Sequence, residues 1–600
     1  MFRFIQPDST KSRRDAYGIC FSSLSSHLLQ LPAMKRVIVF LCATLFVGST
    51  AFAQQDGPAL SPSPPGPKPP GFESGAGVSS QANPKPPGFE SGSGLSSQPN
   101  PNIKTPPPPP PAVVPVPIVP PQPNGPVQKS LVRITATAVE PDYRAPWNVG
   151  QLQRGVGAGF VIDSHRILTN AHVVSNSRYL TVERDGDPNR YPARVQFVAH
   201  DCDLALITVS DPDFYKNMLP LKFGGIPELE STVSAYGYPI GGERMSVTTG
   251  IVSRIDFQLY THSAIDQHLA IQISAQINPG NSGGPVMQNA KVVGVAFQGY
   301  SGDVAQGVAY MIPTPVIQRF LKDISSGHYN KYVDLGFLYS KLLNPAQRRY
   351  LGLPDNDRGV LVGTVVQAGS SAKVIRTGDV LLAIDDHPIA SDANVELEGT
   401  RVEMPEVVER KFKGDTVKFD LLRDKKPMTV TVTLGTVWPY FVQGHSYDVR
   451  PRYVLYAGLL FQPLNLDLLE GYQFQLSDLR VRHFFDYYVL DQIYLQHPDV
   501  IVLSNILPDE INTYLAPYRG SIVDEVNGKK MRTLDDLAKA FQEKSDHFVI
   551  KMIGDGPPLV LDGAKVEQAR ERIKTRYNVI QEENLQEQPN AAAPKDRKNI

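Results

Sequence analysis

From Ser130 onward, short apolar runs rich in β-branched residues alternate with clusters of Gly, Asp and Asn. Runs of this length, bounded by turn residues, are typical of strands. Their close spacing predicts an all-β barrel or sandwich rather than βαβ units. The predicted strands are residues 131–139, 157–162, 166–169, 204–209, 232–236 and 272–277.

One helix is expected directly after these strands and another near the end of the chain. Residues 316–321 predict a helix that leaves the β-rich region, with Pro315 at its first position, where the missing N–H of proline costs nothing. The charged segment from Gly563 predicts a helix to about Leu585. We expect this second helix to be solvated and without partners.

The beginning of the chain has a different pattern. Residues 37–48 are almost wholly apolar, follow a basic pair, and precede Ala51-Phe52-Ala53, which fits a small-x-small cleavage site. This order predicts a secretory signal peptide from Met34 to Ala53, because a membrane span needs about 20 apolar residues. Since signals normally begin a chain, we favour Met34 as the true start, with an internal export signal as the alternative.

Proline dominates residues 54–126, which contain nearly half of the chain's 53 prolines. Such a segment cannot build helices or pair into sheets. We expect a disordered spacer, with a ligand for a partner as the less favoured alternative. A stretch at residues 67–75 recurs at 84–92, but two copies are too few for a solenoid. Ordered protein is expected from about Val127.

Length and charge narrow the possible classes of protein. The 600 residues predict about three or four domains of about 150 residues each. The formal net charge of −1 gives no electrostatic basis for binding nucleic acid. The sequence contains no G-x-x-x-x-G-K-[ST] phosphate loop, which favours a function independent of ATP.

Cysteine and histidine usage argues against disulfides and metals. Of the chain's three cysteines, only Cys202 lies after the predicted cleavage site, so the mature chain has no disulfide framework. A lone thiol among apolar residues is most often a packed small side chain. His200, His262 and His268 lack clustered Cys, Asp or Glu at ligand spacing, so we expect ordinary side chains there. Neither a metal site nor a cofactor is predicted.

A serine lies in a glycine-rich turn, Asn278-Pro279-Gly280-Asn281-Ser282-Gly283-Gly284-Pro285-Val286. Glycines let the backbone take unusual conformations and let a ligand approach closely. Alone, the turn fits a plain connection between strands as well as it fits a nucleophile. Upstream, however, His172 follows one predicted strand and Asp203 precedes another. The order His, Asp, Ser is the chymotrypsin order and excludes the α/β-hydrolase order, in which the histidine follows the serine.

The sequence around these three residues resembles the HtrA/Deg family of trypsin-fold serine proteases, over about residues 128–560. The resembling segments are Thr169-Asn170-Ala171-His172-Val173, Asp203-Leu204-Ala205-Leu206, Tyr236-Gly237-Tyr238-Pro239, Thr249-Gly250-Ile251-Val252-Ser253, Gly280-Asn281-Ser282-Gly283-Gly284-Pro285 and Gly307-Val308-Ala309-Tyr310-Met311-Ile312-Pro313. The resemblance implies a mainly β protein, with a chymotrypsin-like double β-barrel protease domain followed by two PDZ-like α+β domains.

On this basis the chain is expected to divide into six parts. These are an N-terminal extension with the signal peptide (1–53), a Pro-rich disordered linker (54–127), a trypsin-like serine protease domain (128–327), a PDZ domain (328–438), a divergent PDZ-like domain (439–562) and a charged C-terminal tail (563–600).

The resemblance assigns roles to the candidate catalytic residues. A serine hydroxyl is a poor nucleophile until a base takes its proton, and His172 would be the base for Ser282. Asp203 would hold the imidazole in the right tautomer. Asp201 is a rival, but the family pattern places the catalytic aspartate directly before Leu-Ala-Leu. The N–H groups of Gly280 and Ser282, with Asn281 as a further donor, would form the oxyanion hole. An inactive protease fold kept for binding is the alternative.

Specificity is expected from the strand that approaches Ser282. By resemblance to the trypsin arrangement, Gln276 lies at the base of the first specificity pocket and Ile277 lines it. Since no carboxylate waits there for Lys or Arg, we expect small or medium aliphatic residues before the cleaved bond.

The region after the protease domain resembles a PDZ domain. Arg358, Gly359, Val360 and Leu361 resemble the loop and strand that receive a peptide carboxyl terminus, and residues 378–384 and 428–434 resemble the core and closing strands. The site would combine an exposed strand edge with backbone N–H groups. A small β-domain with a covered groove is the alternative.

A second, weaker PDZ resemblance follows. Residues 520–528 align with residues 378–386, residues 500–504 resemble residues 361–365, and residues 534–541 predict a helix. Ser521 stands where the pattern has aspartate, and residues 440–499 are longer and more aromatic than usual. Peptide binding is therefore no better supported here than a role in assembly or regulation.

Two functions are expected from different classes. The first is an exported, ATP-independent serine endopeptidase that cleaves misfolded or damaged proteins of the cell envelope. It would bind unfolded proteins, would bind C-terminal peptides at the first PDZ domain, and would assemble as a trimer or a larger homo-oligomer. The second is a PDZ-based chaperone or binding protein whose protease domain is silent. The expected location is the periplasm or the cell envelope.

Overall fold

The structure is a computed structural model that describes residues 125 and 127–586, except residues 164, 240–243, 300–307, 398, 437–438 and 477. The expected signal peptide and nearly all of the expected Pro-rich linker lie outside these residues. None of the described helices is both long enough and apolar enough to cross a membrane.

The first described unit is a closed six-stranded barrel with the strand order β1-β2-β3-β6-β5-β4. Its interior is filled by branched apolar side chains from every strand, among them Ile134, Val182 and Ile207. The strands are β1 (Leu131–Glu140), β2 (Gln151–Val161), β3 (Ile167–Thr169), β4 (Ser177–Arg184), β5 (Tyr191–Ala199) and β6 (Leu204–Val209). The barrel also holds the short helices α3 (Ala171–Val174) and η1 (Pro212–Tyr215).

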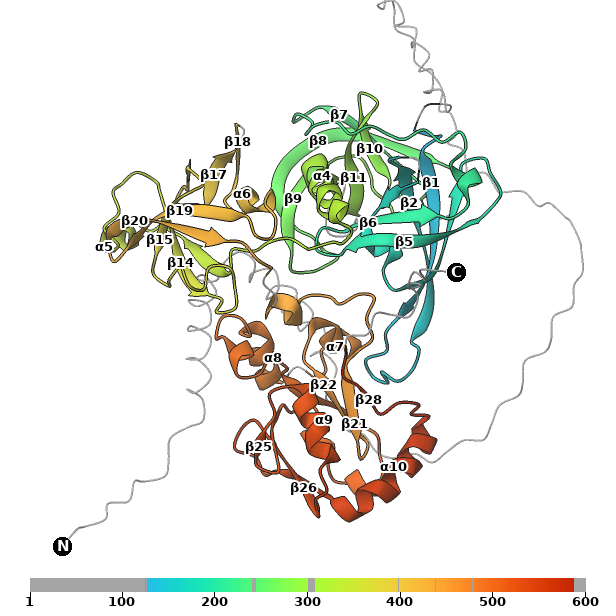
Figure 1. Ribbon diagram of the computed structural model, residues 1–600, viewed down its shortest axis with the longest axis vertical. Coiled ribbons are helices and arrows are strands. Elements are labelled where there is room, and N and C mark those ends of the chain that lie inside the picture. Colours follow the sequence, from blue (N-terminus) through green and yellow to red (C-terminus); the bar gives the residue numbers. More distant parts are fainter. Residues whose placement is uncertain are drawn as a thin grey trace, which may run out of the picture. The chain divides into compact units, whose positions relative to one another are not determined.

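A second closed barrel follows, with the order β10-β11-β12-β9-β8-β7. Its strands are β7 (Thr232–Gly237), β8 (Ser246–Leu259), β9 (Gln267–Ile273), β10 (Pro285–Gln288), β11 (Lys291–Gly299) and β12 (Ala309–Pro313). Helix α4 (Thr314–Asp323), seen beside the strands of this barrel in Figure 1, packs on β11 and β12. Pro315 lies at its start, as expected, and η2 (Ile324–Ser326) continues it.

One apolar core joins the two barrels. It combines Phe160 and Leu206 of the first barrel with Val295 and Ile312 of the second, and α4 adds Phe320. Cys202 is buried in the same core, which confirms the expectation of a packed small side chain. Because the barrels share a core, segments from both are held side by side between them.

The predicted strand at residues 272–277 is shorter in the structure. β9 ends at Ile273, and residues 274–277 continue as irregular chain. This chain is held to β8 by three hydrogen bonds, one of which runs from Ile251 N–H to Ser274 Oγ at 2.9 Å. Ser274 N–H donates to Ile251 O at 3.0 Å, and Thr248 Oγ1 donates to Gln276 O at 2.8 Å. The apolar composition therefore predicted an extended segment correctly. It did not predict that the hydrogen-bonded strand ends at Ile273.

The next domain is built on the sheet order β13-β14-β15-β19-β20, with β16 paired to β15 and a separate β17-β18 hairpin. Its strands are β13 (Phe337–Lys341), β14 (Val360–Val365), β15 (Val380–Ile384), β16 (His387–Pro388), β17 (Asn394–Leu397), β18 (Thr400–Glu403), β19 (Thr416–Arg423) and β20 (Lys426–Thr433). Its helices are α5 (Pro345–Tyr350) and α6 (Glu406–Glu409). The sheet closes over one apolar core that includes Leu381 and Phe419.

The last domain contains two four-stranded sheets, β23-β22-β21-β28 and β25-β24-β26-β27. The strands are β21 (Tyr453–Tyr456), β22 (Leu459–Pro463), β23 (Ile501–Ile506), β24 (Val523–Val526), β25 (Lys529–Lys530), β26 (His547–Met552), β27 (Leu559–Asp562) and β28 (Glu583–Asn584). The helices are α7 (Leu466–Gly471), α8 (Leu479–Asp486), α9 (Leu534–Gln542) and α10 (Gly563–Tyr577), with four short turns η3 (Pro439–Gln443), η4 (Ile493–Leu495), η5 (Glu510–Asn512) and η6 (Ala516–Tyr518). A capping box between Thr533 and Asp536 begins α9, where a helix was predicted.

The expectation of a solvated C-terminal helix without partners is wrong. α10 ends at Tyr577 and buries Val566, Ala569 and Ile573 against the last domain. Three apolar residues spaced along one face are enough to dock a helix even when the rest of its surface is charged. The chain then returns as β28, which pairs with β21 and occupies the outer edge of that sheet.

Candidate active site

His172 lies in a short helix directly after β3. Asn170 stands before the first turn of α3 in an extended conformation, which redirects the chain from strand to helix. β3 pairs with both β2 and β6, so the position of His172 is fixed by the barrel. The imidazole is 33% exposed, and a cavity of about 300 Å³ opens beside it.

Asp203 is held against His172 by several contacts. Its carboxylate lies 2.7 Å from His172 Nδ1 and accepts the backbone N–H of His172 at 2.8 Å. Its own carbonyl accepts a hydrogen bond from Asn170 Nδ2 at 2.8 Å. The backbone of Asp203 has a φ of 50°, in the left-handed region, where Asp is among the more tolerated residues. These contacts turn the side chain back over α3.

The environment shifts both pKa values toward the charged pair. Burial alone would lower the pKa of His172, but the charge and hydrogen bond of Asp203 outweigh burial and raise it. Burial alone would raise the pKa of Asp203, but the charge and the hydrogen bonds of His172 outweigh burial and lower it. The aspartate is therefore ionised, and it stabilises a proton on the histidine.

The glycine-rich turn is attached to the first barrel. Ala158 N–H of β2 donates to Ser282 O at 2.8 Å, which places Ser282 beside the barrel that holds His172. Gly280 has a φ of 103°, and a Cβ there would lie 2.1 Å from Tyr238 O. No other residue type fits this position without moving the backbone.

Two backbone donors of the turn are unused. Asn281 N–H donates to Asn278 O at 2.9 Å. Within the part of the chain that the structure describes, the N–H groups of Gly280 and Ser282 have no hydrogen-bond acceptor. Two free N–H groups flanking one residue are the arrangement that an oxyanion hole needs. Asn281 was expected as a further donor, but its N–H is engaged within the turn.

Ser282 and His172 are not hydrogen-bonded to each other in the described chain, and Ser282 is half-buried. Such a bond is often long in the resting enzyme and tightens when the substrate binds. His172 is therefore hydrogen-bonded directly to Asp203. Ser282 is attached to the same barrel through its backbone carbonyl.

The two predicted specificity residues differ in their surroundings. Ile277 is half-buried and packs against the core of the second barrel, whereas the side chain of Gln276 is exposed. Both lie on the irregular chain between β9 and the turn. No carboxylate is part of this approach segment, residues 274–281.

The aspartate that was considered as a rival has a different role. The carboxylate of Asp201 accepts hydrogen bonds from Tyr329 Oη at 2.8 Å and from the backbone N–H of Tyr332 at 3.1 Å. Both tyrosines lie on the chain that follows α4. Asp201 therefore secures the loop that bears Asp203 and does not contact His172.

The three histidines that were expected to be ordinary side chains surround this loop. His268 contacts Asp201 O through Nε2 at 3.1 Å and Glu409 of α6 through Nδ1 at 2.5 Å. His200 contacts His262 at 3.0 Å. Their sequence spacing gave no signal, because each partner comes from another strand or another domain. The described residues hold no group of His, Cys, Asp and Glu that could bind a metal.

The predicted peptide-binding residues lie inside the sheet of the first PDZ domain. Val360 and Leu361 begin β14, which pairs with β13 on one side and β15 on the other. Gly359 N–H donates to Ile389 O at 2.9 Å, and the carbonyl of Arg358 accepts from Arg348. A strand paired on both sides cannot receive another, so the expectation does not fit this place in the sheet. The terminal strand of the sheet is β13.

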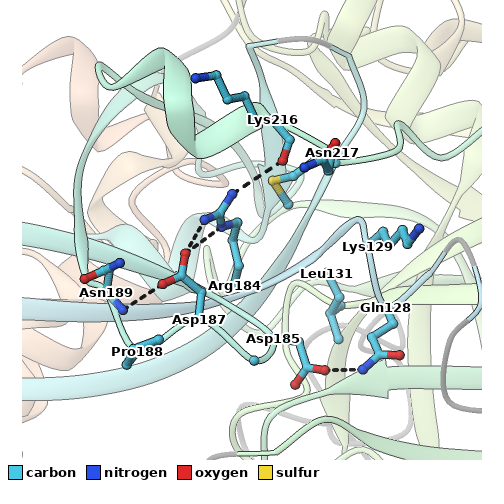
Figure 2. A pocket seen from close by; sticks show the side chains of 12 residues that line it. Gln128, Lys129, Leu131, Arg184, Asp185, Asp187, Pro188, Asn189, Lys216 and Asn217 are labelled. Carbon is cyan, nitrogen blue, oxygen red and sulfur yellow. Dashed lines mark hydrogen bonds and ion pairs between the residues drawn. The ribbon is translucent and has the colours of Figure 1, made fainter.

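A larger cavity of about 840 Å³ lies elsewhere on the first barrel (Figure 2). Arg184 and Asp187 pair across it, and the Arg184 hydrogen bonds, with that from Asn189 N–H, lower the pKa of Asp187 to about 2. Gln128 donates to Asp185 at its edge. None of the residues that line this cavity is a predicted site residue.

Two closed six-stranded barrels, with a histidine–aspartate pair and a glycine-rich serine turn between them, define a trypsin-type serine endopeptidase. Family models agree with this class and with the domain order. A trypsin-like peptidase domain matches residues 157–295, and PDZ domains match residues 350–434 and 442–584. The second PDZ match includes α10 and β28, beyond residue 562, where we expected the domain to end.

The chain belongs to the Do-like (HtrA/Deg) family of serine proteases with PDZ domains. It is 34% identical over 459 residues to Protease Do-like 2, chloroplastic, from Arabidopsis thaliana, covering 76% of this chain and 74% of that protein. It is 33% identical over 412 residues to Protease Do-like 4, mitochondrial, from the same plant, covering 68% and 76%. Among solved structures, an HtrA-type protease AlgW with a decapeptide is 22% identical, with a TM-score of 0.41, over 52% of this chain and 97% of that one.

Proposed function

We propose that this chain is an ATP-independent serine endopeptidase that cleaves misfolded or damaged proteins, with Ser282, His172 and Asp203 as its catalytic triad. The observation that supports this most strongly is the double contact of His172 with one carboxylate, at 2.7 Å to Nδ1 and 2.8 Å to the backbone N–H. A buried carboxylate on Nδ1 leaves Nε2 as the proton acceptor, which is the tautomer a general base needs.

In this mechanism His172 takes the proton of Ser282 as the hydroxyl attacks the peptide carbonyl, and then gives that proton to the leaving amine. Asp203 stabilises the imidazolium that forms between these steps. The free N–H groups of Gly280 and Ser282 would bind the oxyanion, and one such donor is worth about 2.7–4 kcal/mol of barrier. Water then releases the acyl group by the same sequence in reverse.

The residue before the cleaved bond is proposed to be small or medium aliphatic. The half-buried Ile277 and the lack of a carboxylate on the approach segment support this preference. A cleavage-site profile on an unfolded test protein would show it directly. Cleavage mainly after Lys or Arg would contradict the proposal.

Regulation is proposed to act through the first PDZ domain and through assembly. The outer edge of β13 ends its sheet, which suits the addition of a substrate's C-terminal strand. In the second PDZ domain β28 already pairs with the outer edge of β21, so an added peptide would compete with the chain itself. A homo-oligomer, a trimer or a multiple of one, is proposed from the family resemblance and is measurable by light scattering.

We also propose that the chain is exported, with Met34 to Ala53 as the signal and the periplasm or cell envelope as the destination. The relatives named chloroplastic and mitochondrial provide the rival destination, an organelle. Mass-spectrometric sequencing of the mature N-terminus, together with cell fractionation, distinguishes the two. A mature chain that begins at Gln54 in the envelope fraction is the expected result.

The experiment that tests the catalytic assignment compares Ser282→Ala with the unchanged chain. The variant should lose cleavage of an unfolded protein and labelling by a fluorophosphonate, while binding of that protein is kept. Ser234→Ala is the matched control, because Ser234 lies in the same barrel and its hydroxyl contacts that of Thr249 at 3.1 Å. If the unchanged chain is not labelled, with or without C-terminal peptides, the silent PDZ-based binder is the better description.

A further inference from the structure

The segment of residues 444–448, at the start of the second PDZ match, packs on the protease domain beside His172. The ring of Tyr447 stacks on His262 with ring centres 4.1 Å apart and planes 17° apart, and it stacks on His200 at 5.0 Å and 27°. Its hydroxyl donates to the carbonyl of His262 at 2.8 Å. A second-PDZ residue is thus built into the surface of the barrel.

Asp448 secures this arrangement through hydrogen bonds. Its carboxylate contacts His200 Nε2 at 3.0 Å and accepts the backbone N–H of Asn176 at 2.6 Å, while the Asn176 side chain accepts the backbone N–H of Asp448 at 2.7 Å. His200 Nδ1 then contacts His262 Nε2 at 3.0 Å. A carboxylate only accepts, so Nε2 of His200 holds a hydrogen and donates it to Asp448.

The charge state of His262 matters because this ring lies close to both His172 and Asp203. Burial lowers the pKa of His262 to about 3, although the charge of Asp203 opposes this. Its ring centre lies 6.1 Å from that of His172. A neutral His262 adds no positive charge that would compete with His172 for Asp203. The stacked rings of Tyr447 and His262 therefore form an uncharged wall next to the catalytic pair.

This wall borders the 300 Å³ cavity that opens beside His172. Tyr447, His262 and His172 line the cavity together with residues of the first barrel, among them Ala136, Val173 and Gly155. A peptide bond that is cleaved between His172 and Ser282 brings its neighbouring side chains to this place. Its volume of about 300 Å³ is enough for one substrate side chain.

A second contact between the two domains holds the segment in place. Trp147, on the loop between β1 and β2, is 6% exposed and packs among Tyr453 and Ile573. Arg144 on the same loop donates from Nε to Gly471 O at 2.9 Å. The protease domain and the second PDZ domain therefore contact each other at a second place besides residues 444–448.

We propose that Tyr447 is a specificity-determining residue of the proteolytic site, supplied by the second PDZ domain, and that it limits the size of the substrate side chain accepted beside His172. The inference rests on the proposed roles of His172 and Ser282. It makes the substrate cleft a composite of two domains, so the second PDZ domain shapes cleavage even where it binds no peptide.

The test uses the full chain and a peptide library that varies the residues on both sides of the cleaved bond. Tyr447→Ala should widen the cavity and raise kcat/KM for large over small side chains at one position by about tenfold or more, since a methylene-sized change in a pocket is worth about 10–200-fold. Tyr447→Trp should shift the ratio in the opposite direction. Tyr447→Phe keeps the ring and should keep the profile.

Tyr456→Ala is the matched control, because Tyr456 is also a stacked tyrosine of the second PDZ domain. Its ring centre lies 4.1 Å from that of Phe541, and it packs against that domain's own core. It should leave the profile unchanged. Unchanged profiles in both the Ala and the Trp variants of Tyr447, with fluorophosphonate labelling of Ser282 intact, would overturn the inference. If the unchanged chain is not labelled at all, the catalytic assignment of Ser282 is contradicted instead. Failure of the inference about Tyr447 and failure of the catalytic assignment can therefore be told apart.

Discussion

His172 and Asp203 are joined twice, once through the imidazole at 2.7 Å and once through the backbone N–H of His172 at 2.8 Å. The two oxygens of one carboxylate thus fix both the orientation of the ring and the position of the helix that bears it. Loss of the charge and loss of the geometry can be separated, because asparagine keeps an oxygen that accepts the backbone N–H.

Asp203→Asn should lower kcat by about 10⁴-fold, because an amide N–H facing Nδ1 forces the tautomer that cannot take the serine proton. Steady-state cleavage of a peptide measures this effect. The control is Asp201→Asn, two residues away, whose carboxylate contacts Tyr329 and Tyr332 instead of the imidazole. Equal losses of kcat in the two variants would show that activity depends on the conformation of the loop and not on the contact between the Asp203 carboxylate and His172.

The pH dependence of activity should report His172. The base acts when neutral, so kcat/KM falls as the pH drops through its pKa. Because Asp203 raises that pKa above 6.5, the acid midpoint of the profile should lie above pH 6.5. His262 does not titrate in this window, since its pKa is about 3. A midpoint below pH 6.5 in the unchanged chain would contradict the pairing.

Gly280→Ala should remove activity while leaving the fold intact. A Cβ there meets Tyr238 O at 2.1 Å, so the peptide must move, and with it one oxyanion donor. The expected loss in kcat is about 10²–10³-fold. Gly327→Ala is matched for backbone strain, with a φ of 94° and open space around its Cβ, and should retain activity. Circular dichroism and the rate of fluorophosphonate labelling measure the two effects.

The pair of His268 and Glu409 should make stability depend on pH. Burial opposes protonation of His268, but Glu409 outweighs it and raises the pKa to about 9. A raised folded-state pKa gives stabilisation that is fully present below pH 6.5 and is lost as the pH rises through 9. The free energy of unfolding should therefore fall from pH 6.5 to 9.5, and this fall should be smaller in Glu409→Gln.

Denaturant unfolding at several pH values measures this slope. Glu543→Gln is the control, because Glu543 pairs with Lys529 on the surface, where an ion pair contributes little. A slope that is unchanged in Glu409→Gln would mean that other groups set the pH dependence. Because His268 also contacts Asp201 O, the same variant should lower activity at neutral pH.

The β-rich class could be predicted from local pattern, and the order of the domains from the resemblance of their motifs to the HtrA/Deg family. Short apolar runs between turn residues marked β1, β3, β6 and β7 nearly to their ends, because a buried strand needs branched apolar residues wherever it is placed. Pro315 and residues 534–541 marked helices for similarly local reasons. The end of β9 and the packing of α10 were not predicted. Both depend on which part of the folded protein packs against the segment, and local sequence does not contain that information.

The sequence by itself also determined which residues could perform the chemistry, because a serine among glycines, a histidine after a strand and an aspartate before one are local patterns. Only the tertiary structure decided what surrounds them. Glu409 reaches the loop that bears Asp203 through His268, and Tyr447 stacks on His262; each of these partners lies more than 140 positions away in the chain. Such contacts produce no recognisable pattern in the sequence, because they form only when folding brings distant segments of the chain together.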